Sequence, residues 1–214
     1  MGENVTIAFG TKSHNANAKF LLPVIRGWRK AIDSYVKEWS GTDAPYHNNE
    51  RANVGSLAGG AWLNGWSVLE EYPNPKKKNK KAKRASGRVD LYVRKRKRQA
   101  IFEAKHSRIN ATKITSVELN QKIKFHMKEA LEAARRETFT NCKFGCVFFV
   151  PRFSNRDYRQ KTRSILTKHI KQYKKSRDAD LWAWCFPRYT RNYQDEDGGS
   201  FYPGVILALK KCPE

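Results

Sequence analysis

Residues 87–107 read GRVDLYVRKRKRQAIFEAKHS, and this stretch decides how the rest of the chain is interpreted. Apolar residues predict two short strands, at 88–93 and 99–105, joined by a run of arginine and lysine. We expect the strands to pair as a β-hairpin with Arg96 and Lys97 at its tip. Arg-Lys is a poor pair for a tight two-residue turn, so a looser connection is also compatible with the pattern.

The hairpin carries acidic side chains at matching places. Because side chains alternate along a strand, Asp90 and Tyr92 are expected on one face of the first strand. Glu103 and Lys105 likewise share one face of the second strand. The pairing would place Asp90 directly across from Glu103, on the same face of the sheet. The other face of the first strand would carry Val89, Leu91 and Val93.

Two carboxylates held together in a sheet repel each other unless a cation compensates them. Mg²⁺ prefers oxygen ligands, and the main-chain carbonyl of Ala104 would add one to the carboxylates of Asp90 and Glu103. Lys105, beside the metal, could hold or help to deprotonate an attacking water and stabilise charge on phosphorus. The alternative is a surface hairpin whose charged side chains are simply solvated.

The overall charge points to a polyanionic partner. The chain of 214 residues has 43 Lys and Arg against 20 Asp and Glu, a formal net charge of +23. Such an excess is typical of nucleic-acid-binding proteins. A membrane partner is disfavoured, since no apolar run approaches the ~18 residues of a membrane span.

A basic segment separates two of the predicted strands. Seven of the nine residues 76–84 are Lys or Arg. Such runs are usually solvated loops, but this one interrupts a sheet, so we interpret it as a basic arm at about 76–86. Together with the hairpin tip it is expected to contact nucleic acid. The predicted contact residues are Lys76, Lys77, Lys78, Lys80, Lys81, Lys83, Arg84, Arg94, Lys95 and Arg96.

The rest of the chain completes an α/β pattern. Apolar periodicity predicts helices at 18–39, 49–63, 116–137 and 154–177, further strands at 66–73, 142–151, 180–189 and 202–211, and a loop at 41–49. Gly55, Gly59 and Gly60 in the second helix indicate close packing against a sheet. The expected arrangement is one domain over residues 1–214, with a central mixed β-sheet flanked by helices on both faces.

Asp90, followed after twelve residues by Glu103-Ala104-Lys105, resembles the core motif of the PD-(D/E)XK nuclease superfamily. With the upstream helix that carries Glu50, the similarity covers about residues 50–121. The resemblance implies a restriction-endonuclease-like fold and cleavage of DNA with Mg²⁺ or Mn²⁺. It implies that Asp90 and Glu103 bind the metal, that Lys105 is catalytic, and that Glu50 is a further acidic ligand.

The sequence also departs from the family pattern. Val89 stands where the motif has proline. Glu70 and Glu71 compete with Glu50 for the place of the third acid, and Glu50 is favoured because it shares a helix stripe with apolar residues. Gln121, with Phe125 four residues later, resembles the Gln-x-x-x-Tyr motif of RecB-like members with phenylalanine in place of tyrosine.

Other side chains have ordinary structural interpretations. His106 is expected to point away from the site by strand alternation. Trp182 and Trp184 share a strand face, where they could stack on bases, although core packing is the default. Cys142, Cys146, Cys185 and Cys212 match no zinc pattern and are expected to be buried, reduced thiols of a cytoplasmic protein.

The sequence as a whole predicts a metal-dependent nuclease that hydrolyses phosphodiester bonds in nucleic acid, with DNA and internal cleavage favoured. The alternatives are a non-catalytic basic nucleic-acid-binding protein and an inactive nuclease-like subunit. A homodimer is one further expectation, because many nucleases cut both strands as dimers.

Overall fold

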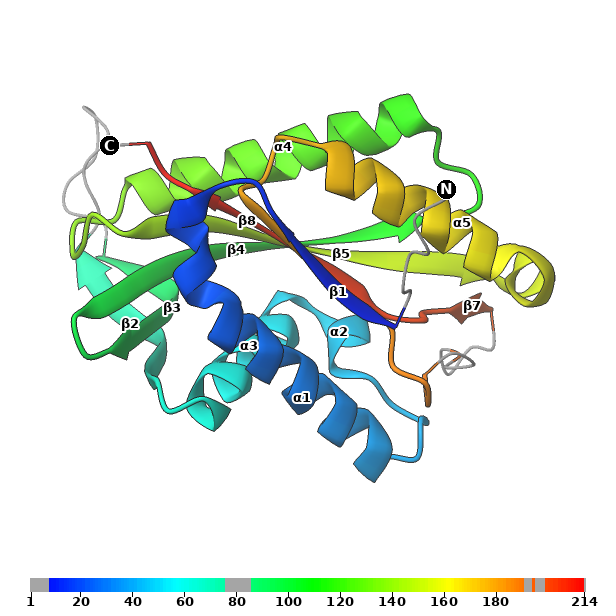
Figure 1. Cartoon of the computed structure of the whole chain (residues 1–214), viewed down its shortest axis with the longest axis horizontal. Coiled ribbons are helices and arrows are strands. Elements are labelled where there is room, and N and C mark those ends of the chain that lie inside the picture. Colours follow the sequence, from blue (N-terminus) through cyan, green and yellow to red (C-terminus); the bar gives the residue numbers. More distant parts are fainter. Residues whose placement is uncertain (1–7, 76–85, 191–193, 195–198, 214) are drawn as a thin grey trace.

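The computed structural model describes residues 8–75, 86–190, 194 and 199–213. The seven predicted contact residues of the basic arm, from Lys76 to Arg84, lie outside this described part of the chain. Elements are labelled as in Figure 1.

The centre of the fold is a mixed eight-stranded sheet with the order β1-β6-β8-β5-β4-β3-β2, and β7 pairs with β5 beside this path. The β4–β5 pair is parallel and the other neighbours are antiparallel. The strands are β1 Phe9–Ser13, β2 Ser67–Pro75, β3 Ser86–Lys95, β4 Arg98–Asn110, β5 Lys143–Ser154, β6 Leu181–Cys185, β7 Ser200–Phe201 and β8 Val205–Lys211.

Helices cover both faces of the sheet (Figure 1). On one face lie α1 Leu22–Glu38, α2 Pro45–Asn48 and α3 Glu50–Leu63, preceded by the 3-10 helix η1 Ala16–Leu21. On the other lie α4 Ser116–Arg135 and α5 Asn155–Lys175. Each layer has its own buried apolar cluster against the sheet. The predicted α/β arrangement, a mixed sheet flanked by helices, is confirmed.

Several predicted elements differ in extent. The strand expected to end at Lys105 continues to Asn110, because β4 keeps pairing in parallel with β5 as far as Arg152. β1, α2 and β7 were not predicted, since all three are short. The pattern therefore located the long elements and missed the short ones at the periphery of the sheet.

Gly60 departs from the expectation that the glycines of α3 pack against the sheet, whereas Gly55 lies beside Glu70 of β2. A Cβ on Gly60 would lie 2.1 Å from the main-chain nitrogen of Trp28, so Gly60 packs against the backbone of α1 instead. A Cβ on Gly27 of α1 would in turn lie 1.9 Å from the carbonyl oxygen of Gly60. The glycines thus bring two helices into backbone contact.

The β3–β4 hairpin turns tightly at the predicted tip. Lys95 pairs with Arg98, so Arg96 and Lys97 form the turn, and Arg96 takes the left-handed φ of 56° that such a turn requires. Leu91 opposite Phe102 is the last pair of the ladder.

Strand alternation fails at one predicted position next to this point. Leu91 and Val93 belong to the apolar cluster under α1 and α3, as expected. Val89 does not join them, and instead packs in a small cluster with Tyr92 and Ile101. The strict alternation assumed for Val89 is therefore wrong where β3 separates from β4.

The remaining structural expectations concern buried side chains. Trp182 and Trp184 are 0% and 5% exposed and pack in the cluster under α4 and α5, so core packing is confirmed. All four cysteines are free thiols, three of them buried and Cys142 half-buried. No helix in the described part of the chain is long and apolar enough to cross a membrane.

Candidate active site

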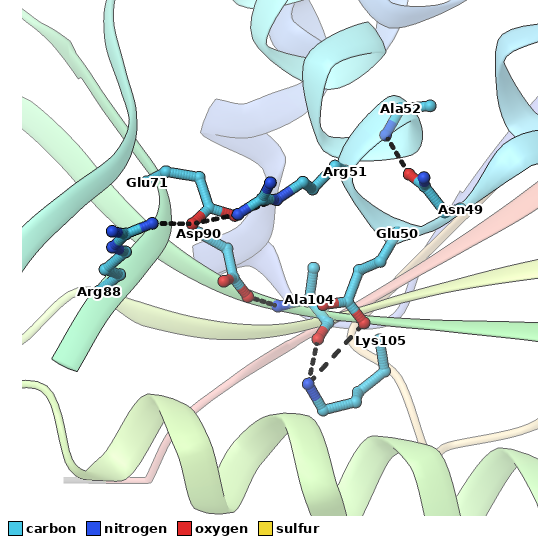
Figure 2. A network of polar contacts seen from close by, with 9 residues as sticks. All are labelled: Asn49, Glu50, Arg51, Ala52, Glu71, Arg88, Asp90, Ala104 and Lys105. Carbon is cyan, nitrogen blue, oxygen red and sulfur yellow. Dashed lines mark hydrogen bonds and ion pairs between the residues drawn. The ribbon is translucent and has the colours of Figure 1, made fainter.

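The site begins where β3 and β4 separate. Beyond the last ladder pair, a side chain and not the backbone of β3 bonds to β4. Oδ2 of Asp90 accepts a hydrogen bond of 2.6 Å from the main-chain N–H of Ala104. The β3–β4 ladder thus ends one position before the expected pair of Asp90 with Glu103. At this position the Asp90 carboxylate faces the backbone of β4 at Ala104 (Figure 2).

Glu50 reaches the same place from the first turn of α3 (Figure 2). The Asn49 side chain caps the helix by accepting a 2.9 Å hydrogen bond from the N–H of Ala52. Arg108 on β4 donates to the carbonyls of His47 and Asn48, at 2.8 and 3.1 Å, in the segment just before the helix. These bonds hold the start of α3 against β4.

Lys105 lies between two of the predicted metal ligands. Its Nζ is 2.6 Å from the carbonyl oxygen of Ala104 and 3.8 Å from Oε2 of Glu50. Figure 2 shows the ammonium beneath the carbonyl, with the carboxylate of Asp90 on the amide side of the same residue. Glu50, Asp90, Ala104 and Lys105 thus form one continuous polar group, called the β4 site below.

The carboxylate of Glu50 is crowded by other acids. Burial raises the pKa of Glu50, and the charges of Asp90 and Glu71 raise it further. The Lys105 ammonium and a hydrogen bond from the backbone of His106 act in the opposite direction, but the net pKa shift is upward. Burial is thus the main reason why the charged form of Glu50 is disfavoured in this site.

Glu103 lies beside the β4 site on the same strand. Its side chain is only 3% exposed. Its charge contributes to a pKa of about 12 for Tyr72, after burial and the charges of Glu137 and Tyr92. Glu103 is thus a buried carboxylate whose charge acts on Tyr72 of β2.

The two rivals of Glu50 have other neighbours. Glu71 contacts Arg51, with 3.2 Å between Oε1 and Nε, and Arg88, with 3.8 Å between Oε2 and Nη1. The Glu70 carboxylate lies over α3, at 3.7 Å from where a Cβ on Gly55 would stand. Of the three acids, only Glu50 contacts Lys105, while Glu71 acts on the site through its charge.

Two further predicted residues lie apart from this group. Gln121 is exposed on α4, whose buried side carries Leu119 and Ile123, and among the described residues no contact joins it to the β4 site. The His106 side chain bonds to the backbone of Tyr46, and burial lowers its pKa to about 4, with the Arg108 charge adding to the shift. His106 nevertheless contributes its backbone to Glu50.

Arg51 and Arg108 were not foreseen as parts of the site. Arg51 pairs with Glu71, and Arg108 fastens the segment before α3. Both contacts join residues far apart in the chain, so no local pattern could have revealed them. Arg94, Lys95 and Arg96, predicted to contact nucleic acid, are exposed at the hairpin tip.

The donor atoms of the β4 site suit a hard divalent cation. Asp90, Glu50 and the Ala104 carbonyl offer oxygen, the element that Mg²⁺ and Mn²⁺ prefer, and the predicted ligand Glu103 lies beside the site. Two of these oxygens already face one cationic group, the ammonium of Lys105. Within the described ranges, however, no three His, Cys, Asp or Glu side chains stand close enough together to form a ready metal cage.

Comparisons of the chain with models of known protein families, with curated proteins and with solved structures find no match. The function of the chain is therefore inferred from the side chains described above.

Proposed function

We propose that the chain is a metal-dependent nuclease of the PD-(D/E)XK type, which hydrolyses phosphodiester bonds in DNA at internal positions. The observation that carries the proposal is the β4 site itself. Lys105 touches the Ala104 carbonyl and lies near Glu50, and Asp90 accepts the Ala104 amide. Acids are unfavourable on a surface that only binds phosphates, so their presence in a chain of charge +23 favours chemistry.

Each residue has a task in this proposal. Asp90, Glu103, Glu50 and the Ala104 carbonyl would hold Mg²⁺ or Mn²⁺, which supplies a polarised water and compensates charge on the phosphate. Lys105 orients the attacking water and stabilises the charge that builds on phosphorus. Burial is the main cause of the raised pKa of Glu50, and a bound cation would offset the cost of its buried charge.

The test is incubation with labelled single-stranded, duplex and junction DNA and with RNA, in Mg²⁺, Mn²⁺ or chelator. We expect cleavage of DNA with either metal, and none by Asp90→Asn or Lys105→Gln. Lys113→Gln is the matched control, because Lys113 is an exposed lysine on the loop after β4 and outside the β4 site. If the wild-type chain cuts no substrate with either metal, the proposal fails.

A second candidate function is non-catalytic nucleic-acid binding, either alone or as an inactive nuclease-like subunit. The observation in its favour is that the described residues contain no preassembled cluster of three metal-binding side chains. On this alternative Asp90 serves only to satisfy the amide of Ala104. The same assay decides, because a pure binder retains DNA without cutting it.

Cytoplasmic location and a homodimer that cuts both strands complete the proposal. The free thiols favour a reducing compartment. The dimer is tested by the molar mass of the chain in solution, with and without duplex DNA.

A further inference from the structure

A basic groove runs between α4 and α5, on the α5 side of α4. It has a volume of about 830 Å³ and is lined by polar residues of both helices and of the segment that follows α5. Among the described side chains that line it, five are basic and one, Asp178, is acidic. The basic ones are Lys124, Lys168, Lys171, Lys175 and Arg177.

The groove continues along α4 into a smaller hollow of about 160 Å³, which shares Lys124 and Asp178 with it. This hollow adds Lys128, Arg135 and Lys210. Asp178 is the one acid that lines either hollow in the described part of the chain, and it accepts a hydrogen bond from Ser176. The basic residues that line the two hollows therefore form one continuous row, called the track below.

The lysines of the track are available to a ligand. Lys168, Lys171 and Lys175 are exposed, and none of them forms an ion pair within the described residues. They recur on one side of α5 and cover about 10 Å of helix axis. Gln172 lies among them and ties α5 to α4 by donating to Asn120 at 3.0 Å and to the carbonyl of Ser116 at 2.6 Å. These hydrogen bonds therefore hold the lysine-bearing side of α5 in a fixed position relative to α4.

We propose that this groove binds the sugar-phosphate backbone of duplex DNA, outside the β4 site. A duplex carries one charge per about 1.7 Å of its axis, so a row of cations over ~10 Å meets several phosphates. None of the described side chains that line the groove is aromatic, whereas single-strand sites stack bases on aromatic rings. The proposal deepens the proposed function, because it names a duplex as the substrate class.

An anionic membrane is the other common partner of a basic helix, but α5 is unsuited to it. Membrane-surface helices insert an apolar face below the headgroups. Among the described apolar residues of α5, Leu166, Ile170 and Tyr173 are buried in the protein core at 3% exposure or less, and the partly buried Ile165 packs against the same cluster. The groove therefore offers charge and hydroxyl groups without an apolar face to insert.

The test compares two triple variants that lose equal charge. One replaces Lys168, Lys171 and Lys175 with glutamine. The control does the same at Lys19, Lys30 and Lys37, which are exposed on η1 and α1 at the opposite face of the sheet. Binding to a labelled duplex is titrated at several salt concentrations in chelator, so that cleavage plays no part.

We expect the groove triple to lose at least about tenfold in affinity and to reduce the log–log salt slope by up to about 2.7, which is about 0.9 for each lost phosphate contact. The control triple should bind like the wild type. A charge-retaining triple, with Lys168, Lys171 and Lys175 replaced by arginine, should also bind like the wild type and shows that charge is the property required.

Three results would overturn the inference. They are an equal loss of duplex binding in the control triple, a single strand bound more tightly than the duplex, and a loss of binding only to vesicles of phosphatidylcholine and phosphatidylserine. The proposed function is judged separately. A chain that binds duplex through the groove but cuts nothing with Mg²⁺ or Mn²⁺ disproves the nuclease and leaves the groove standing.

Discussion

The ammonium of Lys105 lies 3.8 Å from the carboxylate of Glu50, which joins β4 to the first turn of α3. The two side chains are 33% and 38% exposed, so the ion pair adds little to stability. We expect Lys105→Gln to change the free energy of unfolding by less than about 1 kcal/mol and to lower the rate of DNA cleavage at least about 100-fold. Urea unfolding and single-turnover cleavage measure the two effects. Loss of folding in this variant would show that the lysine is structural.

Asp90 has two separable tasks, because it accepts the amide of the buried Ala104 and is a predicted metal ligand. Asp90→Asn keeps an oxygen acceptor, whereas Asp90→Ala leaves the amide without this partner, at a cost of about 1–3 kcal/mol. Both variants should be inactive, and only the alanine variant should lose stability in urea unfolding. Wild-type cleavage by Asp90→Asn would remove Asp90 from the chemistry.

Three acids near the site are expected to differ in importance. Glu50→Gln should impair cleavage most, because Glu50 contacts Lys105. Glu71→Gln should have an intermediate effect, since it frees Arg51 and Arg88 and alters the charge at Glu50. Glu70→Gln should cleave at close to the wild-type rate. The cleavage rate of each variant at saturating duplex is the measurement, and the reverse order would assign the third acid to β2.

The raised pKa of Glu50 predicts how stability depends on pH. A carboxyl whose pKa is raised by folding binds its proton more tightly in the folded state. That stabilisation is complete below the unfolded value of 4.5 and is lost as the pH rises through the folded value. Glu50→Gln should therefore be more stable than the wild type at pH 7 in chelator, and the difference should shrink at pH 4. Urea unfolding at both pH values is the check, and a less stable variant at pH 7 would contradict it.

A bound metal ion should make the wild-type chain more stable than Glu50→Gln at pH 7. Mg²⁺ and Mn²⁺ should raise the melting temperature of the wild type and support cleavage, because a ligand that binds only the folded state stabilises it. Ca²⁺ should also bind but should not support cleavage, since its looser coordination places the water less well. Glu50→Gln and Asp90→Asn should show a smaller rise. Full cleavage in excess chelator would rule out the metal.

The long elements could be predicted from the sequence because one side of each is buried, so that apolar residues recur at the spacing of a helix or a strand. Trp28, Ile32 and Val36 fall on the buried side of α1 at helical spacing, and all are fully buried. β1 could not be predicted, since the five residues of FGTKS hold a single large apolar side chain and form a strand only by pairing with β6. A short edge strand forms only when it pairs with its neighbouring strand, and the neighbour of β1 lies far away in the sequence.

Sequence spacing singled out Glu50, Asp90 and Lys105, which the structure brings together, but it did not predict their geometry. The sequence around Asp90 and Glu103 predicted a β-hairpin and the position of its tip. It did not reveal that the ladder ends at Leu91 and that the Asp90 carboxylate then turns to the amide of Ala104. Strand separation depends on how α3 and β2 pack nearby, which alternation alone does not encode.

The place of β8 has a consequence for how the protein is made. β8, the last strand in the described chain, lies inside the sheet between β5 and β6. During synthesis, β2 to β5 with the β4 site can pair as soon as they emerge from the ribosome. Among the described strands, β1 precedes the others but joins the sheet only through β6, and β6 joins it only through β1 and β8. The N-terminal strand must therefore wait for residues 205–211, and a ribosome that pauses before them would hold a half-sheet with an open edge on β5.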